Sequence, residues 1–239
     1  MFRLAYQNAW LTSSQAYPVE YDFSKSFNSI LPMAMYRNKI SDSSNVRIFY
    51  RSSSTAPTVS QLQEVVDNSN PLQLTSGNAN LDQEVEHSIR GNYDLNSPKK
   101  GRLFSVFASA KYTQDYIGTS TLLAASDTVI NGYELSRGSQ YSTPVNMDGY
   151  FNAQTSLTYG FPVSSLKSNL NLTGGASYTN APGLLNGNAN NAKTTGLSGG
   201  AVLGSNISEK VDFTLSYKGS YNFVNNTLAS VVDNNYFNH

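Results

Sequence analysis

The sequence predicts an all-β protein, an antiparallel up-and-down meander of about nine long strands that forms part of a transmembrane β-barrel. Three observations lead to this prediction. Apolar and polar residues alternate over long stretches, short and long connections follow one another in turn, and aromatic residues gather toward the strand ends. Together they describe strands with apolar surroundings on one face and water on the other.

Alternation is cleanest between Glu84 and Leu95. There Val85, His87, Ile89, Gly91, Tyr93 and Leu95 share one face, while Glu84, Glu86, Ser88, Arg90, Asn92 and Asp94 share the other. The pattern recurs at 145–161 and 211–223, with weaker copies at about 2–12, 26–40, 46–54, 102–116, 168–180 and 193–206. We expect the apolar face to meet lipid and the polar face to line the barrel interior.

The connections alternate in length. Short turns are expected near 41–45, 96–101, 162–166 and 208–210, and long loops near 13–25, 55–80, 117–144 and 181–192. Periplasmic turns and longer extracellular loops are the organisation of an outer-membrane barrel. We therefore expect residues 1–239 to form an outer-membrane β-barrel domain of the bacterial cell outer membrane, in contact with its lipid. An odd number of strands leaves two open edges, which favours a partial barrel, a fragment of a longer one.

Aromatic residues supply the third signal. Near the short turns lie Tyr93, Phe104, Tyr159, Phe161 and Phe213, and toward the long loops lie Tyr112, Tyr116, Tyr178, Tyr221 and Phe223. Two such bands are expected where aromatic rings meet the two membrane–water interfaces.

Composition excludes several other classes of protein. Lys plus Arg and Asp plus Glu number 16 each, so the net charge of zero gives no basis for nucleic-acid binding. Charged residues are only 13% of the chain, whereas 16 Tyr and 11 Phe are present, which argues against disorder. The absence of cysteine excludes a disulfide framework and thiolate-bound metals.

Two groups of residues are candidates for functional positions. Charges expected at the lumen wall or rim are Arg47, Arg51, Glu84, Glu86, Arg90 and Lys218. Val59, Leu62, Val65 and Val66 have helical spacing within 58–67, which predicts a short helix in an extracellular loop folded over the barrel mouth. That loop either contacts a ligand or packs on itself.

We assign no catalytic residue, no metal ligand and no cofactor, and we do not expect an enzyme. Asp82, Glu84 and Glu86 follow one another at strand spacing, about 6.6–7 Å apart, which would suit acid–base chemistry. We prefer a hydrated lumen wall, with Arg90 as counter-charge or with the carboxylates in contact with a plug. His87 falls in the lipid-facing register, and His239 is the other histidine of the chain, so a triad or metal site is not expected.

Three stretches resemble a known family. They are Arg51-Ser52-Ser53-Ser54-Thr55-Ala56-Pro57-Thr58-Val59-Ser60-Gln61-Leu62-Gln63, then Asp67-Asn68-Ser69-Asn70-Pro71-Leu72, then Gly77-Asn78-Ala79-Asn80-Leu81. In this order they resemble an extracellular stretch in the barrel of TonB-dependent-receptor-like outer-membrane proteins. Phe27-Asn28-Ser29-Ile30-Leu31-Pro32 resembles the opening of an earlier strand. Specific motifs cover about residues 23–95, and the rest is similar in kind.

The resemblance implies a barrel of about 22 strands, an N-terminal plug domain, the periplasmic partner TonB and energy-coupled uptake of a nutrient that the sequence does not identify. The plug and the TonB box are absent from these residues, so uptake is an expectation for the whole protein. Three alternatives stay open: a non-transporting barrel with a surface-binding or structural role, a barrel enzyme with Asp or Ser hydrogen-bonded to His87, and a soluble β-sandwich.

Overall fold

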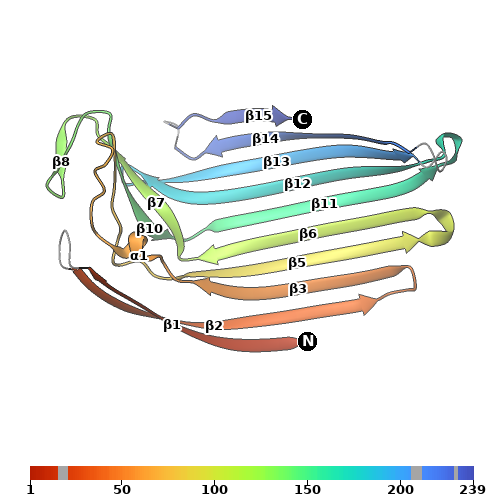
Figure 1. Ribbon diagram of the computed structural model, residues 1–239, viewed down its shortest axis with the longest axis horizontal. Coiled ribbons are helices and arrows are strands. Elements are labelled where there is room, and N and C mark those ends of the chain that lie inside the picture. The colour runs from red at the N-terminus through yellow and green to blue at the C-terminus, as the bar shows by residue number, and fades with distance from the viewer. Residues whose placement is uncertain (16–20, 206–211, 229–230) are drawn as a thin grey trace.

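The computed structural model describes residues 1–15, 21–205, 212–228 and 231–239, and these contain fifteen strands. Ten of them lie side by side in chain order, each antiparallel to the next (Figure 1). They are β1 (Phe2–Gln15), β2 (Tyr21–Lys39), β3 (Ser44–Thr55), β5 (Glu84–Ser97), β6 (Arg102–Gln114), β11 (Tyr150–Val163), β12 (Ser168–Leu185), β13 (Asn188–Ser205), β14 (Thr214–Asn226) and β15 (Asn234–Asn238). The all-β prediction is confirmed, and the predicted strand number of about nine is wrong.

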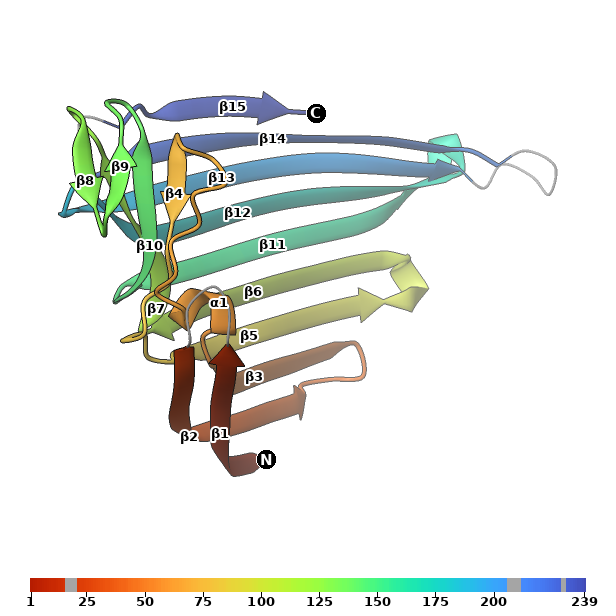
Figure 2. The same cartoon turned by 60° about the vertical axis from the view of Figure 1, so that its left-hand side comes forward.

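The sheet is open, and β1 and β15 form its two edges (Figure 1). The additional elements lie in the long connections at one end of the sheet (Figure 2). They are α1 (Val59–Leu62), β4 (Gln73–Thr75), β7 (Tyr116–Leu123), β8 (Thr128–Ile130), β9 (Tyr133–Leu135) and β10 (Gln140–Met147). We call residues 56–83 and 115–149 the loop lobe. It makes the pairing mixed, because β10 pairs parallel to β4 and β7 pairs parallel to β12.

The alternating stretch 145–161 is two strands rather than one. β10 ends at Met147 and β11 begins at Tyr150, with Gly149 between them at a φ of 97°. Asp115, at a φ of 51°, separates β6 from β7 on the neighbouring strand in the same way. Alternation continues across the break because it reports which face each residue occupies, and this does not require an unbroken strand.

Connections at the opposite end are short. They comprise residues 40–43 and the 3₁₀ turns η1 (Pro98–Lys100) and η2 (Ser164–Leu166), while the turn expected at 208–210 lies outside the described residues. The prediction of a long loop at 181–192 is wrong. β12 and β13 continue through this stretch to a two-residue turn at Asn186 and Gly187, whose φ angles are 50° and 76°. Asn-Gly favours this tight hairpin turn. The described residues of the expected loop 13–25 likewise belong to β1 and β2.

The cross-strand pairing gives the sheet one apolar and one polar face. Directly opposed residues share a face, so Ile89 lies beside Tyr50 and Ala110, and Leu157 beside Val106. Ile89 and Leu157 are 47% and 44% exposed. Large exposed apolar surfaces of this kind mark a membrane or partner interface.

Buried apolar side chains lie mainly in the loop lobe. Among the described residues these are Leu62, Leu74, Leu81, Ala124 and Leu135, with Phe27 of β2 in addition. The long strands have few buried apolar residues because their apolar side chains point outward from a single layer. None of the described helices is long and apolar enough to span a membrane.

Candidate functional site

The six predicted wall charges all lie on the polar face. Arg47 and Arg51 on β3 stand opposite Asn92 and Ser88 on β5, and therefore on the same face as Glu84, Glu86 and Arg90. Lys218 on β14 reaches the same face through the row Gly200, Thr173, Thr158, Ser105 and Asp94. The structure groups the five charges of β3 and β5 and leaves Lys218 several strands away.

Two ion pairs order the charged part of this face. Arg47 Nη2 lies 3.3 Å from Asp94 Oδ2, and Lys111 Nζ lies 3.2 Å from Glu86 Oε2. Glu86 therefore has Lys111 as its counter-charge, and Arg90, the counter-charge expected for the carboxylates, forms no ion pair among the described residues. Asp94 and Lys111 were missed by the sequence reasoning, although alternation on β5 and β6 already placed them on this face.

Asp82, Glu84 and Glu86 do not form the regular carboxylate row that their spacing suggested. Asp82 precedes β5, and its backbone N–H donates to Asn146 Oδ1 at 2.7 Å. Glu84 Oε1 accepts the backbone N–H of Ile117 at 2.7 Å, so this carboxylate holds β7 against the sheet. The carboxylates of Glu84 and Glu86 therefore make structural contacts, whereas Asp82 contacts Asn146 through its backbone.

His87 lies on the apolar face as the alternation predicted. Its Nδ1 is 2.8 Å from the Tyr50 hydroxyl, and the two rings are stacked. Ser88 points to the other face, where its hydroxyl donates to the carbonyl oxygen of Arg51. Within the described part of the chain, no group of three His, Cys, Asp or Glu residues could hold a metal ion.

Tyr116 does not belong to the outer aromatic band. Its ring stacks on Tyr150 at a centroid distance of 4.5 Å. Tyr150 stands opposite Thr113, which stands opposite Glu86, so the stacked pair lies above the polar face. Lys111 Nζ lies 5.5 Å from the centre of the Tyr150 ring. This rim of the polar face thus combines two tyrosines with a paired lysine.

The loop helix is shorter than predicted. Thr58 and Gln61 form a capping box, and α1 ends at Leu62, which is fully buried. The carbonyl oxygens of Gln61 and Gln63 accept the N–H groups of Asn78 and Gly77 at 2.7 and 2.9 Å. This pairing draws the chain into an extended conformation after one turn, so Val65 and Val66 lie beyond the helix.

The stretches that carry the family resemblance are the ones that fold the loop lobe. Asn78 donates through Nδ2 to the carbonyl oxygen of Pro144 at 3.1 Å and accepts the N–H of Asn80 at 3.0 Å. Leu81 is fully buried beside them in sequence. A Cβ on Gly77 would lie 2.3 Å from the carbonyl oxygen of Gln63, so this position accepts no side chain.

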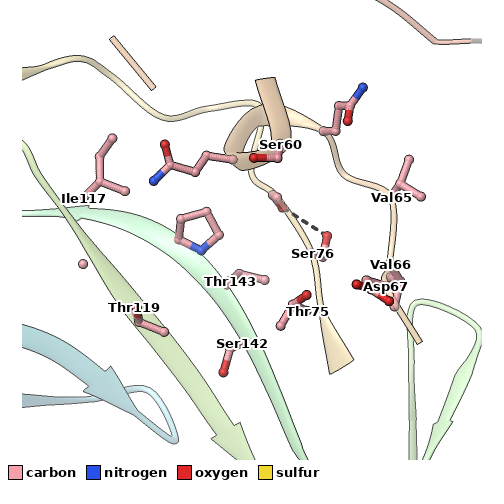
Figure 3. A pocket seen from close by; sticks show the side chains of 15 residues that line it. Ser60, Val65, Val66, Asp67, Thr75, Ser76, Ile117, Thr119, Ser142 and Thr143 are labelled. Atoms are coloured by element: carbon pink, nitrogen blue, oxygen red, sulfur yellow. Dashed lines mark hydrogen bonds between the residues drawn. The ribbon is translucent and has the colours of Figure 1, made fainter. Parts of the chain in front are cut away.

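A pocket of about 530 Å³ lies within the loop lobe (Figure 3). It is lined by Ser60, Gln61, Gln63, Val65, Val66, Asp67, Thr75, Ser76, Gly77, Ile117, Gly118, Thr119, Ser142, Thr143 and Pro144. A second pocket of about 620 Å³ shares Val65, Val66, Ser76, Gly77 and Thr143 with it and adds Tyr133 and Tyr141. Eight of the fifteen residues that line the first pocket carry a hydroxyl or an amide side chain, and apolar groups form the larger part of the lining surface. An N–H of Ser69 that donates to Asp67 keeps the pKa of this exposed carboxylate below its ordinary value.

The pocket joins predicted and unexpected residues. Val65 and Val66 were candidates for the loop site, and both line it. Residues 117–119 and 142–144 were missed, because they come from the other half of the lobe and reach the pocket only through the pairing of β7 with β10 and of β10 with β4. No local pattern in the sequence reports these pairings.

Comparison with known proteins agrees with this architecture. Residues 6–239 match the model of a family described as the outer membrane protein beta-barrel family. No curated protein matches the chain, and no solved structure matches it.

Proposed function

Because the chain belongs to the outer membrane protein beta-barrel family, and the protein therefore lies in the bacterial outer membrane, we propose that it takes part in energy-coupled uptake of a nutrient. The outward face supplies the lipid contact, with uncharged side chains such as Ile89 and Leu157 exposed along the strands. The polar face is then the wall along which a solute passes.

The observation that carries the proposal is the position of the loop lobe: it contains the first pocket and lies at one end of the charged face. The lobe is fixed to that face through Glu84 of β5, whose carboxylate accepts the N–H of Ile117, and through Lys25 of β2, whose ammonium group donates to the carbonyl oxygen of Leu81. A ligand held in the lobe pocket would therefore lie near the entrance to the polar wall. Residues 51–81, which build half of the lobe, also carry the resemblance to TonB-dependent receptors.

Energy coupling is tested with the whole protein in detergent and the purified periplasmic domain of TonB from the same organism. Titration calorimetry should detect a complex in the micromolar range, corresponding to a binding free energy of about −8 kcal/mol. Absence of binding at about 100 μM would rule out coupling through TonB. An unrelated domain of similar size, with a charge pattern opposite to that of the TonB domain, serves as the control for non-specific association.

A surface-binding role without transport is the second candidate. One observation favours it: the residues lining the first pocket belong to the loop lobe, and the long strands contribute none. A ligand could then be held outside the membrane without passing along the wall. Cells that retain a solute at their surface equally well with and without a proton-motive-force uncoupler would support this role over uptake.

A further inference from the structure

Four arginines surround Phe49 on the polar face. Arg47 and Arg51 stand two residues before and after Phe49 on β3, Arg90 stands directly opposite it on β5, and Arg37 on β2 stands opposite Arg47. We call Arg37, Arg47, Arg51 and Arg90 the arginine cluster. All four side chains are exposed, so they are open to a molecule that approaches this face.

Positive charge in the cluster exceeds the negative charge that could balance it. Arg37 and Arg47 are directly opposed, which places their Cβ atoms about 4.5–5.5 Å apart, and like charges in this position destabilise a sheet. Within the described chain, Arg47 is the one member with a carboxylate partner, Asp94. The nearby carboxylates Glu84 and Glu86 are already engaged by Ile117 and Lys111. An added anion would relieve the remaining repulsion.

Phe49 gives the cluster an apolar centre. The guanidinium carbon of Arg90 lies 5.8 Å from the centre of the Phe49 ring, an arrangement that fixes the direction of this flexible side chain. Met35 stands opposite Phe49 on the other neighbouring strand. The surface therefore offers guanidinium donors, which suit phosphate and carboxylate oxygens, next to an aromatic ring and a thioether.

The opposite part of the polar face has a different chemistry. The residues of β11–β14 on this face are mainly uncharged and polar. They include Gln154, Ser156, Ser177, Ser198 and Asn222, which line a shallow pocket of about 230 Å³. Apart from Lys218 on β14, the excess positive charge of the wall thus lies on its β2–β5 side. Rings and rows of Arg and Lys in a pore wall select for anions.

We propose that the arginine cluster is a binding site for an organic anion, a phosphate or carboxylate group carried on an apolar or aromatic body. Arg37 and Arg51 bind the charged group, Arg90 contacts its edge while stacked on Phe49, and Phe49 packs against the apolar part. The site does not depend on energy coupling, so it stands apart from the uptake proposal.

The test uses the whole protein in detergent and titrates phenyl phosphate and inorganic phosphate by calorimetry. The double variant Arg37→Gln/Arg51→Gln leaves the Arg47–Asp94 ion pair in place and should weaken phenyl phosphate binding about tenfold or more, because two charge-assisted contacts are lost. Phe49→Leu should weaken phenyl phosphate binding several-fold while inorganic phosphate binding stays unchanged. Arg37→Lys/Arg51→Lys, which keeps the charge but loses the planar fork, should give an intermediate affinity.

Lys99→Gln/Lys100→Gln is the matched control, because it removes two positive charges at η1, on the turn end of the sheet. It should change phenyl phosphate affinity less than twofold. Equal weakening by the control and by the arginine variant would show attraction to net charge and overturn the site. Absence of phenyl phosphate binding to the unmodified protein would overturn the site as well. If, in that case, Arg37→Gln/Arg51→Gln melted at a lower temperature than the unmodified protein, the result would indicate that an acidic polypeptide segment covers the arginine cluster.

Discussion

Lys25 Nζ donates a hydrogen bond to the carbonyl oxygen of Leu81 at 2.5 Å and thereby joins β2 to the loop lobe. The same ammonium group lies 3.7 Å from Asp82 Oδ1. Nearby, the Gln83 amide donates to Ser29 Oγ and accepts from Ser54 Oγ, both at 2.8 Å. The direct pairing of β2 with β3 ends at Met33 and Arg51, so Gln83 bridges two strands that have separated.

Replacement of Lys25 by methionine should loosen residues 77–83. The substitution keeps an unbranched apolar side chain but removes the ammonium group, and loss of a charged hydrogen-bond donor to a partly buried carbonyl costs about 1.5–3 kcal/mol. Hydrogen–deuterium exchange followed by mass spectrometry should show faster exchange in this segment. Lys39→Met is the control, since Lys39 pairs with Asp42 in full exposure at the far end, and it should leave the exchange of 77–83 unchanged.

Gly77→Ala should disrupt the loop lobe. Its new Cβ would meet the carbonyl oxygens of Gln63 and Gln61 at 2.3 and 2.7 Å, and backbone atoms cannot move aside as a side chain can. Overpacking of this kind costs about 1–3 kcal/mol. Limited proteolysis on intact cells should cleave the variant within 56–83. Gly174→Ala, at a position with no neighbouring atom within 4 Å, should resist proteolysis like the unmodified protein.

Asp115→Asn should stabilise the junction between β6 and β7 at neutral pH. Burial, followed by the negative charges of Asp148 and Asp82, raises the pKa of Asp115 above its ordinary value. The folded state therefore favours the neutral acid, so ionisation costs stability as the pH rises from the ordinary pKa through the raised one. Asparagine removes that cost and accepts the φ of 51° at this position.

The expected result is a melting temperature higher than that of the unmodified protein at pH 7.5, with the difference disappearing near about pH 3, where both forms of residue 115 are neutral. A stabilisation of equal size at both pH values would assign the gain to the backbone conformation instead.

Leu157→Arg should impair assembly into the membrane, whereas Thr158→Arg should not. Leu157 is on the apolar face in the middle of β11, and an arginine facing lipid at mid-membrane costs about 2–4 kcal/mol. Thr158 points to the polar face opposite Ser105 and Thr173. The fraction of folded protein in the outer membrane should fall for Leu157→Arg alone. It is measured on detergent gels, on which folded protein unfolds more slowly during heating than misassembled protein does. Equal effects would contradict the assignment of the two faces.

The faces of the strands were predictable from local sequence. Glu84 to Leu95 alternate without interruption, and because successive residues of a strand point to opposite sides, each residue's face follows from its position alone. The register confirms this for His87 and Ile89 on one side and for Arg90 and Asp94 on the other. The outer-membrane location followed from the same pattern, because uncharged outward positions and polar inward ones suit a strand between lipid and water.

Residue-by-residue partners could not be obtained in this way. The ion pair of Lys111 with Glu86, the hold of Glu84 on Ile117 and the pocket between 60–77 and 117–144 all join residues distant along the chain. The early end of α1 has the same origin, since Gly77 and Asn78 bind the carbonyl oxygens of Gln63 and Gln61 and compete with further helical turns. Alternation is a local property of the chain, whereas these contacts depend on which strands pair and in what register.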